Sequence, residues 1–390
     1  MLRVLTLSTL FPDAARPTLG VFVERQTLGL AAHADVDLRV VSPVGLPPWP
    51  LDRHPRYRPL ATLPLREDWK GLDVLRPRFR KLPGLSGAAM PGAIVRALRP
   101  VLRDLRRDFP FDVIDAEFFF PDGPAAVALG RHFGVPVSIK ARGSDIHRWG
   151  AWPKTGPLVR DAGCRADGLL AVSAAIKRDM VAMGMPPDRI TVHYTGVDLD
   201  RFRPADRAAA KAALGIAGPL LLTVGTLNHS KGHHLVIEAL ADLPSATLII
   251  AGAGPDHALL AALAAQRGLA DRVRLIGPQP HHALPALFAA ADVMALPSAS
   301  EGLANVWVEA LASGTPIVIA DVGGARELVD RPAAGALVAR DPKAIAAAIQ
   351  MLLAFPPDPL AVRATVERFT WAANTAALHA HLSGLVQPRA

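Results

Sequence analysis

The sequence predicts an α/β protein of two doubly wound units, each a parallel sheet with helices on both faces. Its 390 residues are enough for two separate cores. Short apolar runs alternate with segments of helical spacing along the first half, which is typical of a parallel sheet. The alternation restarts after about residue 196, so we expect two units joined near Val197–Pro204.

The apolar runs predict the strands in order. In the first half they are Leu2–Ser8, Val36–Val41, Val113–Ala116, Val135–Ala141 and Gly168–Val172, with a helix at about Val21–Ala32. In the second half they are Pro219–Val224, Ala246–Ala251, Val273–Ile276, Val293–Leu296 and Pro316–Ala320, with a helix from about Gly232. Residues 43–92 are rich in Pro and Gly and predict a long irregular insertion. Because such sheets bind ligands at the carboxyl ends of their strands, two facing units predict a shared cleft.

The composition favours a folded, soluble protein. Apolar residues make up 51% and charged residues 20% of the chain. No apolar run reaches the roughly 18 residues that span a bilayer, and we interpret Met1–Ser8 as a buried strand instead of a signal peptide. Cys164 is the single cysteine, so an intrachain disulfide is excluded. These features predict a cytoplasmic protein.

Positive charge is concentrated in one part of the chain. The formal net charge is +8, and residues 76–107 hold nine basic residues and one acidic residue. Apolar residues at helical spacing over Ile94–Phe109 predict an amphipathic helix with arginines on another face. We favour an ordinary surface helix, with contact to an anionic membrane surface at the inner membrane face as the alternative. Nucleic-acid binding is disfavoured, because no stacking aromatic residues are interleaved with the bases.

The strongest motif is the segment from Glu301 to Pro316. It predicts a helix that begins near Ala304 or Asn305 and ends at Gly314. The free backbone N–H groups and the dipole at its amino end can receive an anion. Glu301 and Glu309 flank that end, where they can bind hydroxyl groups on either side of a diphosphate. Two solvated surface acids are the alternative, which the Gly, Asn and Pro punctuation disfavours.

Two further segments carry candidate site residues. Lys231 follows a strand and begins a helix, where a compact cation can neutralise a phosphate; an exposed lysine is an equally good interpretation of that residue alone. Asp145, in the segment Lys140–His147, follows another strand and is expected at the edge of the cleft; an N-cap of the next helix is the alternative.

Other chemistries find little support. The segment Gly252-Ala-Gly254 lacks the full dinucleotide fingerprint, which disfavours hydride transfer. His229 and His233 have no carboxylate partner that would complete a zinc pattern, so we expect no metal and no cofactor. No motif for a covalent nucleophile is present.

Taken together, these segments resemble the retaining glycosyltransferases of family 4, which adopt the two-domain GT-B fold. The resemblance covers nearly the whole chain, and its most specific element is the pair of glutamates with seven residues between them. The other matching segments are Pro17–Gln26, Arg142–Asp145, Val172-Ser173, Thr195–Asp198 with Phe202 and Pro204, Lys231-Gly232, Gly323-Gly324 with Glu327, and Phe369–Trp371.

The resemblance implies a hexosyltransferase that uses a nucleotide-sugar donor and requires no metal. It implies an N-terminal acceptor-binding domain over 1–196, completed by a C-terminal helix at about 372–390, and a C-terminal donor-binding domain over 197–371. A UDP-sugar is the first donor we expect and a GDP-sugar the second. The expected acceptor is a saccharide or a lipid-linked saccharide, in the synthesis of a cell-surface polysaccharide or glycan.

The resemblance also implies roles for individual residues. Gly20 lets the backbone approach the donor phosphates, Lys231 pairs with the diphosphate, Glu301 binds the hydroxyls of the transferred sugar, and Glu309 holds the ribose. Asp145 faces the sugar or the acceptor hydroxyl. The predicted catalytic residues are Asp145, Lys231 and Glu301, and the predicted donor-binding residues are Gly20, Gly225, Thr226, Lys231, Gly302, Leu303, Ala304, Asn305, Val306 and Glu309.

Two positions depart from the family pattern. Thr226 stands where the family carries an arginine, which removes one charge-assisted contact to the leaving diphosphate. Glu117 stands where a histidine is common. Three alternatives therefore stay open: another GT-B activity such as an epimerase or phosphorylase, a donor-binding scaffold without turnover, and a membrane or nucleic-acid binder driven by the basic stretch.

Overall fold

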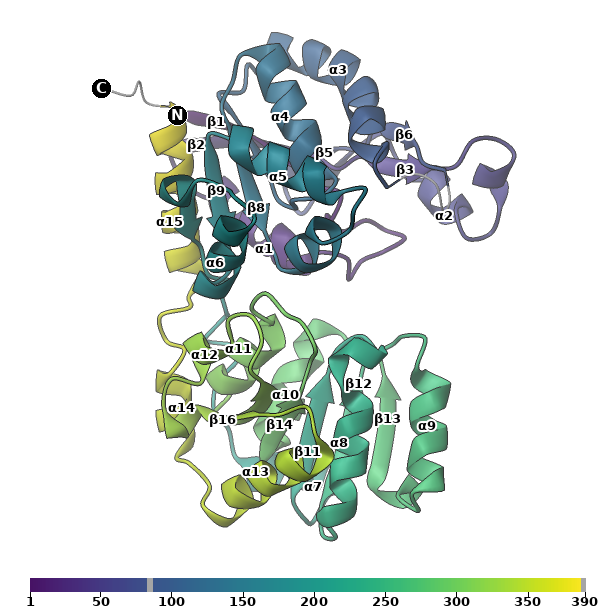
Figure 1. Cartoon of the computed structure of the whole chain (residues 1–390), viewed down its shortest axis with the longest axis vertical. Helices are drawn as coiled ribbons and strands as arrows, with labels where there is room; N and C mark the ends of the chain where they lie inside the picture. The colour runs from purple at the N-terminus through teal and green to yellow at the C-terminus, as the bar shows by residue number, and fades with distance from the viewer. Residues whose placement is uncertain (83–86, 387–390) are drawn as a thin grey trace. The chain divides into compact units, whose positions relative to one another are not determined.

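The computed structural model describes residues 1–82 and 87–386. The chain divides into two compact units, one formed by Met1–Tyr194 with the segment from Trp371 onward, the other by Thr195–Thr370 (Figure 1). Each unit is built on a mainly parallel sheet, so the predicted fold class is confirmed. Among the described residues, no helix is both long and apolar enough to cross a membrane.

The described residues of the first unit form an eight-stranded sheet in the order β10-β9-β8-β7-β1-β2-β5-β4. Its strands are β1 (Leu2–Leu7), β2 (Val36–Val41), β4 (Arg66–Trp69), β5 (Leu72–Leu75), β7 (Val113–Ala116), β8 (Val137–Ala141), β9 (Gly168–Ala171) and β10 (Ile190–Val192). The edge strand β4 pairs antiparallel with β5, and the other pairings recorded in this sheet are parallel. Two further strands, β3 (Val44–Leu46) and β6 (Arg78–Arg80), form a separate parallel pair.

Helices cover this sheet on both faces. They are α1 (Val21–Ala31), α2 (Arg58–Ala61), α3 (Met90–Asp108), α4 (Asp122–Phe133), α5 (Gly156–Arg165), α6 (Ala174–Ala182) and α15 (Trp371–Val386), with short turns η1 (Leu51–Arg53), η2 (Asp145–Gly150) and η3 (Pro187–Arg189). Successive residues of β1 alternate between the faces, and Val4 packs in one core cluster with Val23 of α1 and Leu378 of α15. The last helix of the chain therefore completes the core of the first unit.

The prediction for residues 43–92 was wrong in part. We expected an irregular insertion, but the structure forms β3, η1, α2, β4, β5 and β6 within it and begins α3 there. These strands are only three or four residues long, and β4 (Arg-Glu-Asp-Trp) is polar because it lies at an edge of the sheet. Short polar strands between Pro and Gly carry little periodic signal. The sequence also missed β10.

The basic stretch 76–107 does not form one exposed surface. Arg76 is fully buried and pairs with Glu67, and Arg78 is partly buried. Within α3, Ile94, Leu98 and Leu102 are buried while the arginines of the other face are exposed. The helix thus packs as the ordinary amphipathic surface helix that we favoured.

The described residues of the second unit form a six-stranded parallel sheet in the order β13-β12-β11-β14-β15-β16. Its strands are β11 (Leu220–Val224), β12 (Thr247–Ala251), β13 (Val273–Gly277), β14 (Val293–Leu296), β15 (Ile317–Ala320) and β16 (Gly335–Val338), the last of which the sequence missed. Its helices are α7 (Arg207–Ala213), α8 (His233–Ala239), α9 (His257–Gln266), α10 (Leu284–Ala290), α11 (Asn305–Ala312), α12 (Ala325–Leu328), α13 (Pro342–Ala354) and α14 (Pro359–Ala364). Its short turns are η4 (His229–Lys231), η5 (Leu240–Asp242), η6 (Ala270–Arg272), η7 (His281–Ala283) and η8 (Pro332–Ala334).

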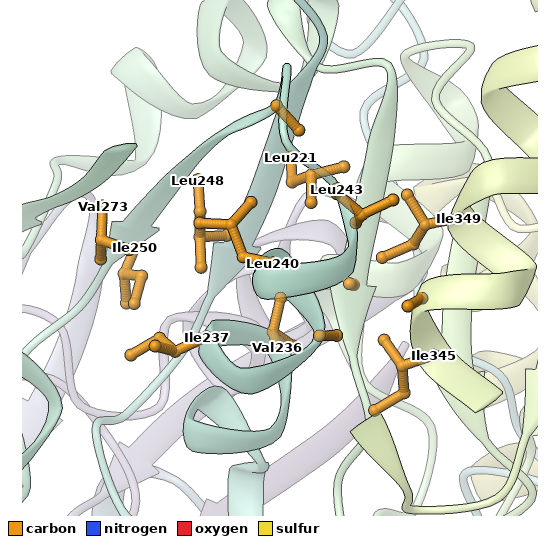
Figure 2. Close-up of a cluster of buried hydrophobic side chains, with 14 of the residues drawn as sticks. Leu221, Val236, Ile237, Leu240, Leu243, Leu248, Ile250, Val273, Ile345 and Ile349 are labelled. Carbon is orange, nitrogen blue, oxygen red and sulfur yellow. The ribbon is translucent and has the colours of Figure 1, made fainter. Parts of the chain in front are cut away.

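One core cluster of the second unit consists of aliphatic side chains. Figure 2 shows Leu248 of β12 near Leu240, and Ile349 of α13 near Leu243, within one cluster that also contains Leu221 of β11. Such β-branched and leucine side chains fill the space between a sheet and its helices without polar atoms that need partners. This rigid layer fixes where the strands end, and the loops that follow the strands carry the polar residues of interest.

Candidate active site

The strand order places the predicted donor residues at one point of the second sheet. The chain runs outward from β11 to β12 and β13, then returns to β14 on the other side of β11. In a doubly wound sheet, the crevice at this reversal is where ligands bind, outside the carboxyl ends of the strands. Lys231 lies in the segment after β11 and Glu301 in the segment after β14.

Lys231 and Glu301 form an ion pair at this reversal. The Lys231 Nζ atom lies 2.5 Å from Glu301 Oε1, and the two side chains are 24% and 12% exposed. The Asn228 side chain accepts a hydrogen bond from the Lys231 backbone N–H at 3.2 Å and so fixes the turn before α8. The Ala299 N–H donates to the Ser230 carbonyl at 2.7 Å, which ties the two loops together. A cation and a carboxylate 70 positions apart are thereby held in one polar site.

The helix that follows Glu301 begins as the sequence predicts. α11 starts at Asn305 after Ala304, and no described side chain caps it. Backbone N–H groups in the first turn of such a helix have no partners within it and suit an anion. The structure places Gly302, Leu303, Ala304, Asn305 and Val306 in this loop and first turn. The helical residues end at Ala312, two before the predicted Gly314, whose φ of +76° closes the helix.

Glu309 is buried one turn into α11 and has a partner that the sequence did not reveal. Its Oε1 atom lies 2.7 Å from His281 Nε2, and the Glu309 side chain is 9% exposed. The ring of His281 packs edge-on against Phe202 at 5.2 Å between centroids. His281 therefore orients the carboxylate that we predict to hold the ribose. No motif in the sequence indicates that His281 lies beside Glu309.

Tight backbone packing shapes the loop around Glu301. Gly323 has a φ of +52°, and a Cβ atom there would lie 2.2 Å from the Glu301 carbonyl oxygen. The Gly324 N–H donates to the Gly302 carbonyl at 2.7 Å. Only glycine permits this approach. The Gly323-Gly324 segment therefore packs against the backbone of Glu301 and Gly302 and helps to position Glu301.

Thr226 is exposed, and its surroundings are organised by a buried histidine. Gly225 follows β11, and its N–H donates to the Ala251 carbonyl at 3.0 Å. The His233 Nε2 atom donates to the Thr226 carbonyl at 3.2 Å, and Nδ1 accepts from the Thr223 hydroxyl at 3.0 Å. Burial lowers the pKa of His233 to about 4, and the neighbouring Lys231 contributes in the same direction. A neutral His233 thus supports the loop that carries Thr226.

This histidine predicts an acid-sensitive donor unit. Because the folded-state pKa of His233 lies below its ordinary value of 6.5, its contribution to stability is present above pH 6.5 and is lost as the pH falls toward 4. We expect the second unit to lose up to about 3 kcal/mol of unfolding free energy over that range. Urea unfolding followed by amide hydrogen exchange of residues 195–370 measures it. His233→Gln should flatten the pH dependence, and an unchanged slope in that variant would contradict the assignment.

In the first unit the reversal of strand order lies between β1 and β7. Gly20 precedes α1 with a φ of +63°, and a Cβ atom there would lie 1.7 Å from the Leu10 carbonyl oxygen. The position therefore requires glycine on backbone grounds alone. Its predicted approach to the donor phosphates stays a prediction.

Asp145 is fully buried and binds backbone amides. Its carboxylate accepts hydrogen bonds from the N–H groups of Phe119 at 2.9 Å, Arg142 at 2.9 Å and Gly143 at 2.8 Å. Burial raises the pKa of Asp145 while these hydrogen bonds oppose the rise. The carboxylate thus organises the loop after β8 against the loop after β7. A direct role toward the sugar or the acceptor stays a prediction.

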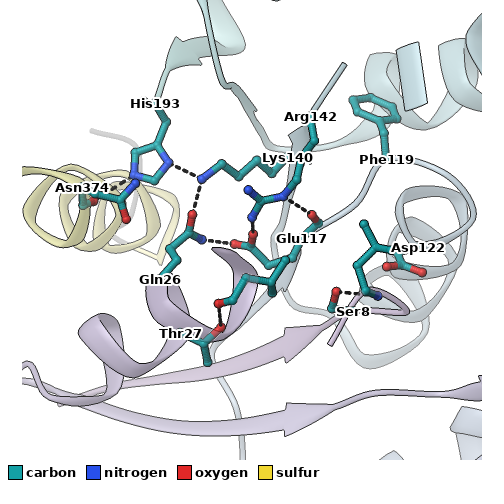
Figure 3. A network of polar contacts seen from close by, with 12 residues as sticks. Ser8, Gln26, Thr27, Glu117, Phe119, Asp122, Lys140, Arg142, His193 and Asn374 are labelled. Carbon is teal, nitrogen blue, oxygen red and sulfur yellow. Dashed lines mark hydrogen bonds and ion pairs between the residues drawn. The ribbon is translucent and has the colours of Figure 1, made fainter. Parts of the chain in front are cut away.

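A buried polar network surrounds Glu117, the second departure from the family pattern (Figure 3). Arg142 and Gln26 both donate to the Glu117 carboxylate, and Lys140 donates to the Gln26 side-chain oxygen. Burial opposes ionisation of Glu117, but the charges of Arg142 and Lys140 outweigh it and lower its pKa. Burial lowers the pKa of Lys140 to about 7, and the charge of Arg142 adds to this.

The network reaches the last helix of the chain. Lys140 Nζ lies 2.6 Å from His193 Nδ1, and His193 Nε2 donates to the Asn374 carbonyl at 2.8 Å. Asn374 Nδ2 in turn donates to the Tyr194 carbonyl at 2.6 Å. Burial holds the pKa of His193 well below its ordinary range, and Lys140 adds to the effect. Hydrogen bonds therefore connect the charged residues at the carboxyl end of the first sheet to α15.

Among the described residues, no group of three or more His, Cys, Asp and Glu side chains is arranged to hold a metal ion. That the reaction proceeds without a metal stays a prediction.

Comparisons with known proteins agree with this architecture. The family described as Glycosyltransferase Family 4 matches residues 23–201, and Glycosyl transferases group 1 matches residues 206–366. A D-inositol 3-phosphate glycosyltransferase of Thermobispora bispora is 33% identical over 327 residues, which cover 75% of this chain and 76% of that protein. One of Nocardia farcinica is 38% identical over 301 residues, which cover 70% of this chain and 66% of that protein.

Solved structures share the fold at low sequence identity. Sucrose-phosphate synthase from Thermosynechococcus elongatus has a TM-score of 0.79 and 20% identity, covering 99% of both chains. Anabaena HepE in complex with UDP-glucose has a TM-score of 0.74 and 20% identity, covering 99% of this chain and 100% of that one. The two units are thus the Rossmann-like halves of a GT-B fold. The chain belongs to glycosyltransferase family 4 and is an enzyme of the hexosyltransferase type.

Proposed function

We propose that this enzyme transfers a hexosyl group from a nucleotide sugar to a saccharide or lipid-linked saccharide, with retention of the anomeric configuration. The observation that carries the proposal is the Lys231–Glu301 pair beside the amino end of α11. It combines a cation and free amides for a diphosphate with a carboxylate for sugar hydroxyls. A UDP-sugar is the favoured donor and a GDP-sugar the second, since Anabaena HepE was solved with UDP and with UDP-glucose.

The proposed chemistry is electrostatic. The bond between the anomeric carbon and the diphosphate oxygen breaks, and positive charge grows on the sugar while negative charge grows on the leaving group. Lys231 and the first amides of α11 stabilise that negative charge. The acceptor oxygen forms the new bond, and its proton passes to an oxygen of the leaving diphosphate. No step needs a metal.

Glu301 changes partners in this scheme. In the structure it is the counterion of Lys231. A donor diphosphate brings competing negative charge to the same ammonium group, so Glu301 must yield at least part of this contact. The carboxylate is then available to accept hydrogen bonds from the hydroxyls of the transferred sugar.

Glu301→Gln is expected to separate binding from turnover. The variant keeps the size of the side chain but removes the charge that holds Lys231, so UDP should bind as tightly as to the wild type or more tightly. The rate of transfer should fall about 10- to 100-fold, because charge-assisted bonds to the sugar weaken. Calorimetric titration of UDP and initial rates at saturating donor measure the two effects. Glu238→Gln, which removes a carboxylate of α8 that pairs with Arg267, is the control. A parallel loss of UDP affinity would instead place Glu301 on the nucleotide.

The function itself is tested by nucleotide release from a panel of UDP-, GDP- and ADP-sugars, with saccharide acceptors and with EDTA throughout. Release from one donor, indifferent to EDTA, would support the proposal and identify the donor. Product configuration is read from the anomeric proton by NMR, where inversion would contradict retention. If no donor in the panel binds in a thermal-shift assay, the proposal fails.

A further inference from the structure

A cavity of about 640 Å³ lies at the carboxyl end of the first sheet. This volume lies in the range of small-molecule sites. The cavity spans the reversal of strand order, because Leu10 follows β1 and Phe118 follows β7. Its described lining residues are Thr9, Leu10, Arg16, Leu19, Pro43, Gly45, Arg56, Tyr57, Leu60, Phe79, Lys81, Met90, Phe118, Phe120, Pro121 and Trp149.

The charge around this cavity is one-sided. Arg16, Arg56 and Lys81 line it, and none of its described lining residues is Asp or Glu. Desolvation of its ammonium group by burial, and then the charges of Arg16 and Arg56, lower the pKa of Lys81. Asp13 compensates the charge of Arg16, with which it pairs at 2.6 Å. The charges of Arg56 and Lys81 therefore remain at the cavity, and no described lining residue is a carboxylate that could compensate them.

The cations come from segments that the fold brings together. Lys81 follows β6, and a Cβ atom at Gly45 of β3 would lie 2.7 Å from the Phe79 ring and 3.0 Å from the Lys81 side chain. Glycine at this position thus leaves room for both side chains. Arg56 lies between η1 and α2, with its guanidinium 5.8 Å from the centre of the Tyr57 ring. The insertion that looked irregular in the sequence supplies most of the charge.

The rest of the lining is apolar and aromatic. Phe79, Met90, Phe118 and Phe120 are buried, and the rings of Phe120 and Trp149 lie 5.1 Å apart. Such a surface can pack against the apolar face of a sugar or cyclitol ring, while the cations bind a group with negative charge. An acceptor with no charge would leave Arg56 and Lys81 without an anionic group among the described lining residues of the cavity.

We propose that this cavity binds the acceptor and that the acceptor carries a phosphate or diphosphate group held by Arg16, Arg56 and Lys81. The inference rests on the proposed transfer function and specifies its acceptor. The donor diphosphate is assigned separately to Lys231 of the second unit. A phosphorylated sugar or cyclitol in solution and a lipid-linked diphosphate share this chemistry.

The first test titrates inorganic pyrophosphate into the full chain with UDP at saturation, so that the donor site is filled. Arg56→Ala and Lys81→Ala should each weaken pyrophosphate binding about 10-fold or more. Lys81→Arg should recover most of the loss. Arg58→Ala is the matched control, because Arg58 is an exposed arginine of the same insertion that does not line the cavity. Equal binding in all variants, or none in the wild type, would overturn the inference.

The second test compares acceptors that differ only in phosphate: D-inositol 3-phosphate with inositol, glucose 6-phosphate with glucose, and a polyprenyl diphosphate sugar with the same sugar on a neutral alkyl chain. The phosphorylated member should be used, with its KM raised about 10- to 100-fold by Lys81→Ala and the donor KM unchanged. The pair that reacts distinguishes a soluble from a lipid source. Use of the phosphate-free members alone overturns the inference, whereas absence of UDP binding overturns the transfer function instead.

Discussion

Lys231→Ala is expected to lower the rate of sugar transfer about 100- to 1000-fold. The ammonium group stands in the crevice where the strand order of the second sheet reverses, 2.5 Å from Glu301. It is the cation that we assign to the leaving diphosphate, and removing one such group from a preorganised site costs several kcal/mol of transition-state stabilisation. With no arginine at Thr226, no second cation of the family pattern compensates. Nucleotide release at saturating donor measures the effect.

Lys211→Ala is the matched control for that experiment. Lys211 lies in the same unit and pairs with Asp292 at the same distance of 2.5 Å. Asp292 precedes β14 and accepts from the Leu220 N–H at the start of β11, so this pair lies at the amino ends of the strands. Both variants lose one partly buried ion pair, but only Lys231→Ala should lose activity. Equal loss in both would show that the effect of Lys231 is on stability.

Glu117→Ala is expected to destabilise the first unit by about 3 to 5 kcal/mol. The variant leaves the largely buried Arg142 without its ion-pair partner and removes a negative charge near Lys140, and breaking a buried ion pair by removing one partner is costly. Gln26 also loses the acceptor of its side-chain N–H. Urea unfolding with hydrogen exchange of residues in β7, β8 and α1 measures the loss in this unit separately from the other.

Asp161→Ala is the control for the buried network. Asp161 pairs with Arg165 on the exposed surface of α5, where such pairs contribute under about 1 kcal/mol. Adding Lys140→Met to Glu117→Ala should recover part of the stability, because the uncompensated ammonium is then removed. If Glu117→Ala unfolds at the same urea concentration as the wild type, the network around Glu117 does not stabilise the first unit.

Much of the donor side could be predicted from local patterns. The start of α11 near Asn305 and the turn before α8 follow from Gly, Asn and Pro signals within a few residues, and the structure confirms both. The cavity that we propose for the acceptor could not be predicted in this way. Lys81, Arg56 and Arg16 lie in three separate segments, and the strands β3 and β6 that bring Lys81 to Gly45 are too short to show periodicity.

The sequence by itself determined the two doubly wound units, the order of most strands along the chain, and the residue types that can bind a diphosphate. These depend on hydrophobic spacing and on local backbone preferences, which are properties of neighbouring residues. Only the tertiary structure decided which of them meet. β11 lies beside β14, although β12 and β13 come between them in the chain, and this order joins Lys231 to Glu301. In the same way His281 meets Glu309 and Asn374 meets His193, because packing of the completed core selects contacts that no local pattern encodes.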